Sequence, residues 1–379
     1  MKSPYYATTS DANTAHRSDG TFDSYVPITP AKKINEIANT LKVRSAEAAV
    51  RKYIPEQLSF WPEDRRAIAN ELARSALFKC CDNRKPRTYF DNVSLFMLGE
   101  GSLTYKGEEL RSKDEDLFVT LAHRARNLPS GKMVVRMTSS DICKMNNWRQ
   151  DQRYYNDIFL SIQRMKGGVI TVFSRRLAKA LKCQRALDAG ASNDELTRLH
   201  DELTEFEKSA LSELPLDQKG EEIAGMMLSL ISNEPTFTGA TSIKDGIPQG
   251  NLAWEITLDK KLVSLLAKPY LTLVDFKARQ ALTASGKRLQ AYFLSHKKPF
   301  PVKLRSLEKM LGLNFADLGA LKFNIAAQLA DLKAHQVIAG YNFTKSADGT
   351  DWLVTVVRNP ERLQATDHAS KIVKSDQND

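Results

Sequence analysis

The chain has 379 residues, of which 42% are hydrophobic and 8% aromatic, so it is long enough for two or three packed domains and is not a disordered protein. Its formal charge of +10 is unevenly placed: residues 71–176 and 226–379 carry excesses of +7 and +6, whereas residues 177–225 carry −5. Lys and Arg supply the sequence-independent part of DNA affinity, so this distribution favours a nucleic-acid partner.

Neither a membrane segment nor a metal site is indicated. There is no run of about 18 apolar residues, and residues 1–24 lack the apolar core of a signal peptide, so we expect a cytoplasmic protein with no membrane partner. The cysteine spacing fits neither zinc nor a disulfide framework, which predicts a reduced protein without metal or cofactor. The four cysteines are Cys80, Cys81, Cys143 and Cys183.

The first 125 residues divide into a polar N-terminal segment, 1–65, and the beginning of a folded region. A helical pattern at residues 31–53 lies within the segment. The folded region is expected to contain a strand at 103–105, a turn at Lys106-Gly107 and a helix at 114–125.

Residues 138–173 have the pattern of a short helix, a tight turn, a longer helix and a strand. Residues 138–141 form a capping-box pattern, and Asn146-Asn147 ends the first helix. The second helix runs from about 151 to 166 and is followed by a strand at 169–173. Its predicted buried stripe is Tyr155, Ile158, Phe159, Ile162 and Met165. The polar side chains expected away from that stripe are Arg149, Gln152, Arg153, Asn156 and Arg164.

The middle of the chain predicts an acidic helical hairpin at residues 177–214, with a break at 189–193. Strands at 226–232 and 252–258 flank a connection rich in Gly, Thr and Pro. Pro269 marks a domain boundary, and a long helix is expected to follow from about residue 274 to 296.

Residues 302–357 repeat the plan of the first unit. A helix at 306–311 stops at Gly312, and Asn314 can cap the next helix. The predicted stripe of that helix is Phe315, Leu318, Leu321, Ile325, Leu329 and Leu332, with Lys322, Asn324, Gln328 and Lys333 elsewhere. Alternating strands at 337–343 and 351–357 surround Asp348-Gly349, which indicates a hairpin.

A helix-turn-helix followed by a β-hairpin is a winged helix, and two basic copies indicate a protein that grips a long, specific duplex. An αα-hairpin packed in a core is the alternative interpretation of each copy alone. We therefore predict a helix-rich α+β fold with two tandem winged-helix domains and an acidic helical insertion in or after the first. The predicted boundaries are 1–65, 66–268 with insertion 177–225, 269–362, and a polar tail at 363–379.

Several segments of the chain closely resemble TrfA-type plasmid replication initiators, in the family's order. They are RAIANE at 66–71, ARSALF at 73–78, LTYKGEELR at 103–111, RYY at 153–155 and SHKKPFPVKL at 295–304. The resemblance implies winged-helix domains that bind directly repeated DNA (iterons), melt adjacent AT-rich DNA, with the separated single strand as a further partner, and recruit the host helicase. It also implies a DNA-binding monomer in equilibrium with an inhibitory dimer, and hence plasmid copy control.

The chain departs from the family pattern in three places. The acidic insertion has no counterpart in the family. The similarity is weak beyond Leu313, so the prediction of the second recognition helix depends on helical periodicity alone. The family's sliding-clamp motif Gln-Leu-Ser-Leu-Phe is matched by Gln57-Leu58-Ser59-Phe60-Trp61, with two bulkier residues at its end. This segment therefore predicts either clamp binding or simple packing on the first domain.

Specific base contacts are assigned mainly to the second unit, through Lys322, Asn324 and Gln328, because Asn and Gln pair with adenine edges and Lys reaches guanine or phosphate. The first unit is expected to place Arg149, Gln152, Arg153 and Asn156 in an adjacent major groove, with Arg164 as a further contact. Lys297, Lys298, Lys303 and Arg305 are the expected phosphate contacts. Two grooves one turn apart predict a site of roughly 20 bp.

The sequence predicts no enzymatic activity. It contains no G-x-x-x-x-G-K-[ST] loop, so melting would be driven by binding energy rather than by ATP hydrolysis. A nicking rolling-circle initiator that uses Tyr154 or Tyr155 is disfavoured, because the six histidines include no His-x-His pair to hold the required metal. A winged-helix repressor of its own promoter is the remaining alternative, and it would read an inverted repeat as a dimer.

Overall fold

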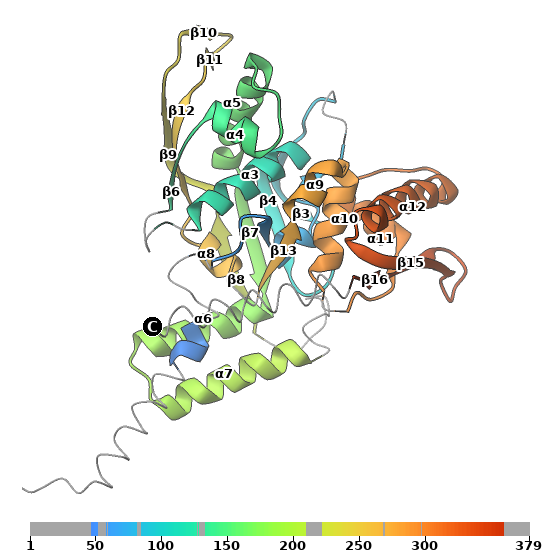
Figure 1. The fold of residues 1–379 in the computed structure, drawn as a ribbon. Coiled ribbons are helices and arrows are strands. Elements are labelled where there is room, and N and C mark those ends of the chain that lie inside the picture. The colour runs from blue at the N-terminus through green and yellow to red at the C-terminus, as the bar shows by residue number, and fades with distance from the viewer. Residues whose placement is uncertain are drawn as a thin grey trace, which may run out of the picture. The chain divides into compact units, whose positions relative to one another are not determined.

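Two antiparallel sheets form the strand framework of the N-terminal half (Figure 1). The computed structural model describes residues 47–51, 58, 60–81, 85–126, 128, 133–209, 222–267, 270–296 and 298–359, all within the unit Ser45–Asp379. The first sheet has the strand order β3-β4-β7-β8. Its strands are β3 Tyr89–Leu95, β4 Ser102–Glu108, β7 Val169–Ser174 and β8 Ala224–Leu228.

The predicted turn at Lys106-Gly107 is wrong, because β4 continues to Glu108. Gly107 has a φ of +142°, and a Cβ at this position would lie 2.9 Å from the Cα of Gly168. The absence of a side chain at Gly107 therefore allows β4 to pass close to Gly168, the residue that ends the helix at Gln152–Gly167.

The predicted first helix-turn-helix is present as α4 (Ser139–Met145) and α5 (Gln152–Gly167). The hydroxyl of Thr138 accepts from the Asp141 amide at 3.1 Å, and the Asp141 carboxylate accepts from the Thr138 amide at 3.2 Å, which confirms the capping box. Four of the five stripe residues on α5 are buried, and Tyr155 is half-buried. This stripe packs α5 against α3 (Ser112–Ala125) and β4.

The second sheet has the order β6-β12-β9 and continues into a hairpin beside α5. The strand predicted at 226–232 is in fact two strands, because β8 ends at residue 228 and β9 begins at residue 231. The strand predicted at 252–258 is confirmed as β12. An aromatic cluster of Phe159, Phe237 and Trp254 ties this sheet to α5, with ring centroids 5.2 to 6.1 Å apart. The elements are β6 Val134–Thr138, β9 Ile231–Thr238, β10 Ser242–Lys244, β11 Ile247–Gln249 and β12 Ala253–Leu258.

The helical hairpin predicted after the first unit is confirmed as α6 (Arg175–Asp188) and α7 (Asn193–Lys208). Ser192 begins α7 by accepting from the Glu195 amide. Cys183, Leu196 and Leu203 form the buried contact between the two helices. Val50, Ala267 and Tyr270 belong to the same small apolar cluster, so the hairpin is packed against residues outside it as well.

The long helix predicted at 274–296 is wrong. Its beginning is strand β13 (Leu271–Asp275), which pairs with β1 (Arg65–Ala69), and the rest divides into α9 (Phe276–Ala281) and α10 (Ala284–Leu294). Thr283 caps α10 by accepting from the Gly286 amide at 3.1 Å. The remaining short elements nearby are α2 Asn70–Ala73, β2 Phe78–Lys79, β5 Leu110–Arg111 and α8 Leu262–Leu265.

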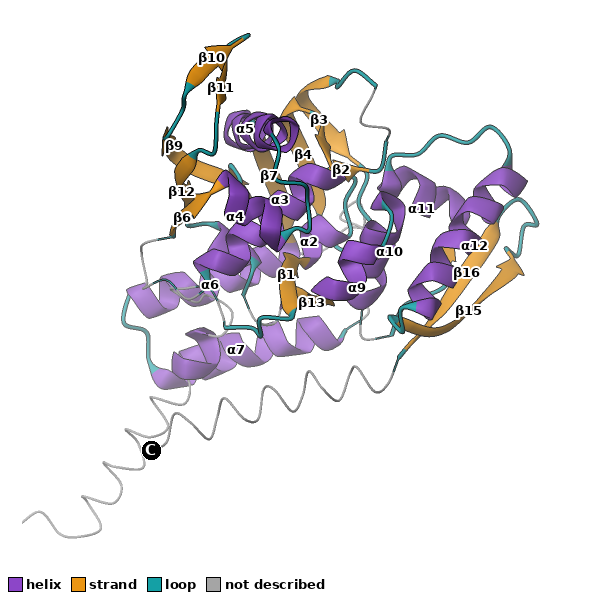
Figure 2. Cartoon of the chain, turned by 45° about the horizontal axis from the view of Figure 1, so that its top comes forward, coloured by secondary structure: helices purple, strands orange, loops and turns teal. Residues whose placement is uncertain are grey.

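The C-terminal unit consists of a second helix-turn-helix and a three-stranded sheet of order β14-β16-β15 (Figure 2). Gly312 ends the first helix in the left-handed conformation, with a φ of +67°. The second helix is capped by Asp317 rather than Asn314, because residues 312–316 form the turn and the Asp317 carboxylate accepts from the Ala320 amide. The elements are β14 Val302–Lys303, α11 Leu304–Leu311, α12 Leu318–Ala334, β15 Ile338–Lys345 and β16 Trp352–Arg358.

The described residues have one large apolar core in each half of the unit. The first draws on residues from Leu58 to Val274 and includes Ala291, and the second on residues from Ala278 to Val356. Buried ion pairs connect the halves: Glu115 of α3 contacts Arg279 at 2.9 Å and Arg288 at 2.6 Å. The mixture of helix and strand agrees with the predicted α+β class.

Candidate nucleic-acid interface

The turn between α11 and α12 is fixed by one glutamate and one arginine. Glu308 accepts from the Phe315 amide, and it also contacts Arg305 at 2.9 Å. Arg305 in turn donates to the carbonyl oxygen of Phe315 at 2.7 Å. Arg305 was predicted to contact phosphate, but it already has partners within its own unit. Through these bonds it fixes the turn and so the orientation of α12 relative to α11.

One face of α12 is fully buried. Asn324 and Gln328, two of the predicted base-contacting residues, lie at the edge of this buried face. Gln328 accepts a hydrogen bond from the hydroxyl of Thr283 at the beginning of α10. Asn324 is half-buried, and its Oδ1 atom is enclosed without a partner among the described residues. Gln328 therefore has a partner on the neighbouring helix in this conformation, and its role in base contact stays a prediction.

Lys322, the third predicted base-contacting residue, lies over the hairpin. Its Nζ is 3.2 Å from the ring centroid of Trp352 and 5.4 Å from that of Phe343. Lys345 approaches the same Trp352 ring at 4.6 Å. These cation–π contacts connect α12 to β15 and β16 and place two positive charges at this edge.

Two of the predicted phosphate contacts are exposed lysines. Lys298 is exposed, and Lys303 is half exposed with its Nζ 3.7 Å from the Asp348 carboxylate. An exposed pair of this kind contributes little to stability, so Lys303 can exchange Asp348 for a phosphate at small cost. Lys297 lies outside the described residues.

The first unit presents Arg149 and Arg153, both exposed, at the beginning of α5. Gln152 lies between them in sequence, but its Oε1 accepts from the Gly250 amide at 2.9 Å and its Nε2 donates to Asn156 at 2.7 Å. Gln152 and Asn156 therefore link α5 to the chain that follows β11, whereas the two arginines remain exposed to solvent.

Arg164 is the clearest departure from the predicted surface. Its side chain is only 9% exposed, and its guanidinium contacts the Asp114 carboxylate at 3.0 Å. Asp114 also accepts from Arg87 at 2.8 Å and from the Ser161 hydroxyl at 2.5 Å. A fully buried carboxylate therefore holds the Arg164 side chain inward in this conformation, and its contact with DNA stays a prediction.

The segment predicted to bind a sliding clamp is largely part of the core. Leu58 and Trp61 are 4% and 1% exposed, and Trp61 donates to His123 Nδ1 at 3.0 Å. Phe60 is exposed, and Gln57 lies outside the described residues. Leu58 and Trp61 therefore pack on the first domain, which is the alternative interpretation of this segment, and clamp binding stays a prediction.

Burial and two arginines control the charge of His123. They lower the pKa of His123 to about 4, against the opposing effect of Glu63. Hydrogen bonds from His123 and Arg126 lower the pKa of Glu63 to about 2. Because the Trp61 indole can only donate, Nδ1 of His123 accepts and Nε2 donates to Glu63 at 2.9 Å. A neutral His123 thus joins the N-terminal segment to α3.

Tyr154 and Tyr155 are both half-buried on α5. Tyr154 stacks on Trp148 with centroids 6.0 Å apart, and the Lys113 ammonium lies 4.6 Å from its ring centroid. Among the described residues, no three His, Cys, Asp or Glu side chains are grouped so that they could hold a metal ion. The aromatic pair is therefore used for packing in this structure.

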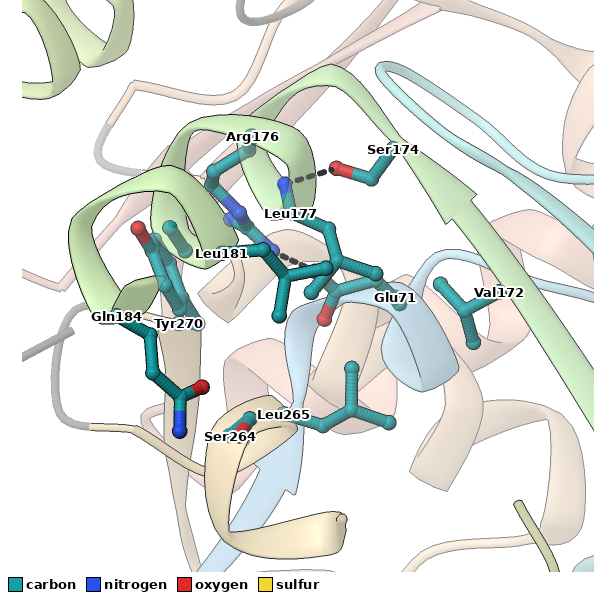
Figure 3. A pocket seen from close by; sticks show the side chains of 11 residues that line it. Glu71, Val172, Ser174, Arg176, Leu177, Leu181, Gln184, Ser264, Leu265 and Tyr270 are labelled. Carbon is teal, nitrogen blue, oxygen red and sulfur yellow. Dashed lines mark hydrogen bonds and ion pairs between the residues drawn. The ribbon is translucent and has the colours of Figure 1, made fainter. Parts of the chain in front are cut away.

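A small cavity lies between α6, α2 and β7, and Figure 3 shows its lining. Its volume of about 20 Å³ gives room for roughly one water molecule. Arg176 and Glu71 form an ion pair at its wall, and Arg176 stacks 3.7 Å from the Tyr270 ring centroid. The cavity is too small for a substrate. In the part of the chain that the structure describes, no helix is long and apolar enough to span a membrane.

Comparison with known proteins identifies relatives of the chain. A model of the TrfA protein family matches residues 30–196. The plasmid replication initiator protein TrfA of Escherichia coli is 23% identical over 292 residues, which are 74% of this chain and 61% of that protein. Two crystal structures of domains 2 and 3 of RctB are 11% identical, with TM-scores of 0.45 and 0.44; they cover 76% and 74% of this chain, and the match spans 97% and 96% of their own chains.

The fold therefore defines a protein with two helix-turn-helix units in a mixed framework of helices and strands. The family match confirms the resemblance stated from the sequence motifs: the model of the TrfA protein family covers four of the five segments quoted above, all within residues 30–196. The chain spans about 61% of the length of the E. coli relative.

Proposed function

We propose that the chain initiates plasmid replication by binding directly repeated origin DNA through two winged helices. The first consists of α4 and α5 with the hairpin β10–β11 beside α5, and the second of α11, α12 and the hairpin β15–β16. The observation that carries the proposal is the repetition itself: each unit presents the beginning of a long helix, with exposed cations on or beside it, in a chain whose relatives include a replication initiator. One unit in each of two successive major grooves gives a site of roughly 20 bp.

The same binding would open the origin. The sequence has no phosphate-binding loop for ATP, so the proposal contains no catalytic step. Cooperative loading on repeats bends the duplex, and AT-rich DNA beside the repeats would melt at the smallest cost. Capture of the separated strand and recruitment of the host helicase would complete initiation, and a monomer–dimer equilibrium would set copy number.

Footprinting of the full chain on the plasmid DNA that flanks its own gene tests this proposal. Evenly phased, directly repeated protections, with distortion in an adjoining AT-rich stretch, are the expected result. A single protected inverted repeat without distortion would instead identify a repressor of its own promoter. The absence of protection at moderate salt would contradict DNA recognition by these units.

A further inference from the structure

The solvent-facing side of α12 is apolar. Phe323 is 81% exposed, the highest value among the large hydrophobic side chains of the described residues. Successive helical residues are 100° apart, so Phe323 shares its face with residues three, four and seven positions away. The exposed neighbours at these positions are all small, namely Gly319, Ala320, Ala327 and Ala330, and Ala334, eleven positions away, continues the same face; Ala326, three positions away, is half-buried.

This face differs from that of an ordinary surface helix, which carries polar side chains opposite its buried stripe. Helix propensity accounts for exposed alanines, but it does not account for Phe323, which is a weaker helix former and places a large apolar ring in water. The opposite face is already packed, because Leu321, Ile325 and Leu329 are fully buried. The exposed face is therefore available to a partner.

Charge and shape indicate the partner. Lys322 and Lys333 lie on one flank of the face, on the side of the hairpin, where Lys345 adds a third cation. Asp331 is on the opposite flank, near the end of the helix. Residues 298–359 contain eight Lys or Arg and five Asp or Glu. An apolar centre with a basic edge is complementary to a DNA major groove bordered by phosphates.

We propose that Phe323 and the small residues around it read thymine 5-methyl groups in the major groove, so that apolar contact supplies base specificity in this half of the site. The small side chains allow the helix backbone to come close to the bases, and the thymine methyl is the apolar group that the major groove offers. Specificity is then assigned to Phe323 rather than to Gln328, which is bonded to Thr283. This inference rests on the proposed function, because it requires α12 to enter duplex DNA.

The test removes single methyl groups from the DNA. Duplexes are selected from a random-sequence library with the full chain, and each thymine of the selected site is then replaced by deoxyuridine, which changes no hydrogen-bonding group. The wild-type chain should lose about three- to tenfold in affinity at one or two of these thymines. Phe323→Ala should bind the thymine and deoxyuridine duplexes equally, and Phe323→Leu should restore part of the difference.

Two controls separate this inference from its alternatives. Phe300→Ala removes another exposed ring, 57% exposed and outside α12, and should leave the methyl effect unchanged. A selected duplex that wild type binds equally with thymine or deoxyuridine would overturn the inference alone. Failure to select any sequence would overturn both the inference and the proposed function. If Phe323→Ala dissociates a dimer and retains the methyl effect, a second copy covers the face and the inference is wrong.

Discussion

Glu115 on α3 and Arg279 on α9 form an ion pair at 2.9 Å in which neither side chain is exposed, although the residues are 164 positions apart. Arg288 binds the other oxygen of the same carboxylate at 2.6 Å. Burial alone would raise the pKa of Glu115, but the two arginines outweigh this effect and lower it. The carboxylate therefore stays ionised and links the first core to the helices that lead into the second.

Replacement of this carboxylate should strongly destabilise the protein. Glu115→Gln leaves two buried guanidinium groups without their shared counter-charge, so the free energy of unfolding should fall by about 3–5 kcal/mol. Urea unfolding measures the change. The matched control is Glu255→Gln, because Glu255 pairs with Arg136 at 2.8 Å on the surface, and its loss should cost less than about 1 kcal/mol. Equal losses in the two variants would contradict the structural role of the buried pair.

Stability should decrease as the pH falls below about 6.5. Burial and nearby arginines lower the pKa of His123 to about 4 and that of His296 to about 3. An unfolded histidine, with a pKa near 6.5, binds a proton that the folded protein excludes, so folded-state stability is complete above 6.5 and is lost progressively toward pH 4. The loss between pH 6.5 and 5 should be on the order of 2–4 kcal/mol for the two residues together.

Unfolding midpoints at several pH values test this dependence. His296→Gln should weaken the pH dependence by roughly half, whereas the exposed His335→Gln should preserve it. An unchanged dependence in the His296→Gln variant would show that other groups cause the loss.

Gln328 should act in stability rather than in base choice. It accepts from Thr283, so Gln328→Ala should cost about 1 kcal/mol and leave sequence preference unchanged. In a double-mutant cycle with Thr283→Ala, the two changes should be coupled by about 0.5–1 kcal/mol. Additive effects together with a relaxed base preference would support the original sequence-based assignment instead.

Exposed lysines in the C-terminal unit should set the salt dependence of DNA binding. Lys298→Ala and Lys303→Ala should each reduce the slope of log affinity against log salt by about 0.9, and should weaken specific and random duplexes alike. Lys260→Ala removes an exposed lysine outside both helix-turn-helix units and serves as the control. A control variant with the same change in slope would argue against a localised phosphate contact.

The sequence predicted those elements whose signals are local. The reciprocal bonds between Thr138 and Asp141, the left-handed Gly312 and the strands around Asp348-Gly349 depend on neighbouring residues, and all were found within a few positions. The prediction of a long helix at 274–296 was wrong because its first residues pair with β1, some 200 positions earlier in the chain.

The partners of the candidate site residues could not be predicted from the sequence for the same physical reason. Helical periodicity places Arg164 and Gln328 off the buried stripe, but it contains no information about Asp114 or Thr283, which hold these side chains. Phe323 was overlooked because periodicity assigns apolar residues to a core, and α12 is apolar on its exposed face as well as on its buried face. The available signal was the absence of a polar face on a helix that covers only one core.

A hydroxyl-radical footprint on one selected repeat tests the central claim that a single chain uses both α5 and α12. Wild type should protect two tracts of backbone about 10 bp apart. The double variant Arg149→Ala/Arg153→Ala should lose one tract, and Ala327→Glu, which places a negative charge on the exposed face of α12, should lose the other. A single protected tract in wild type, or loss of the same tract in both variants, would contradict recognition by two units.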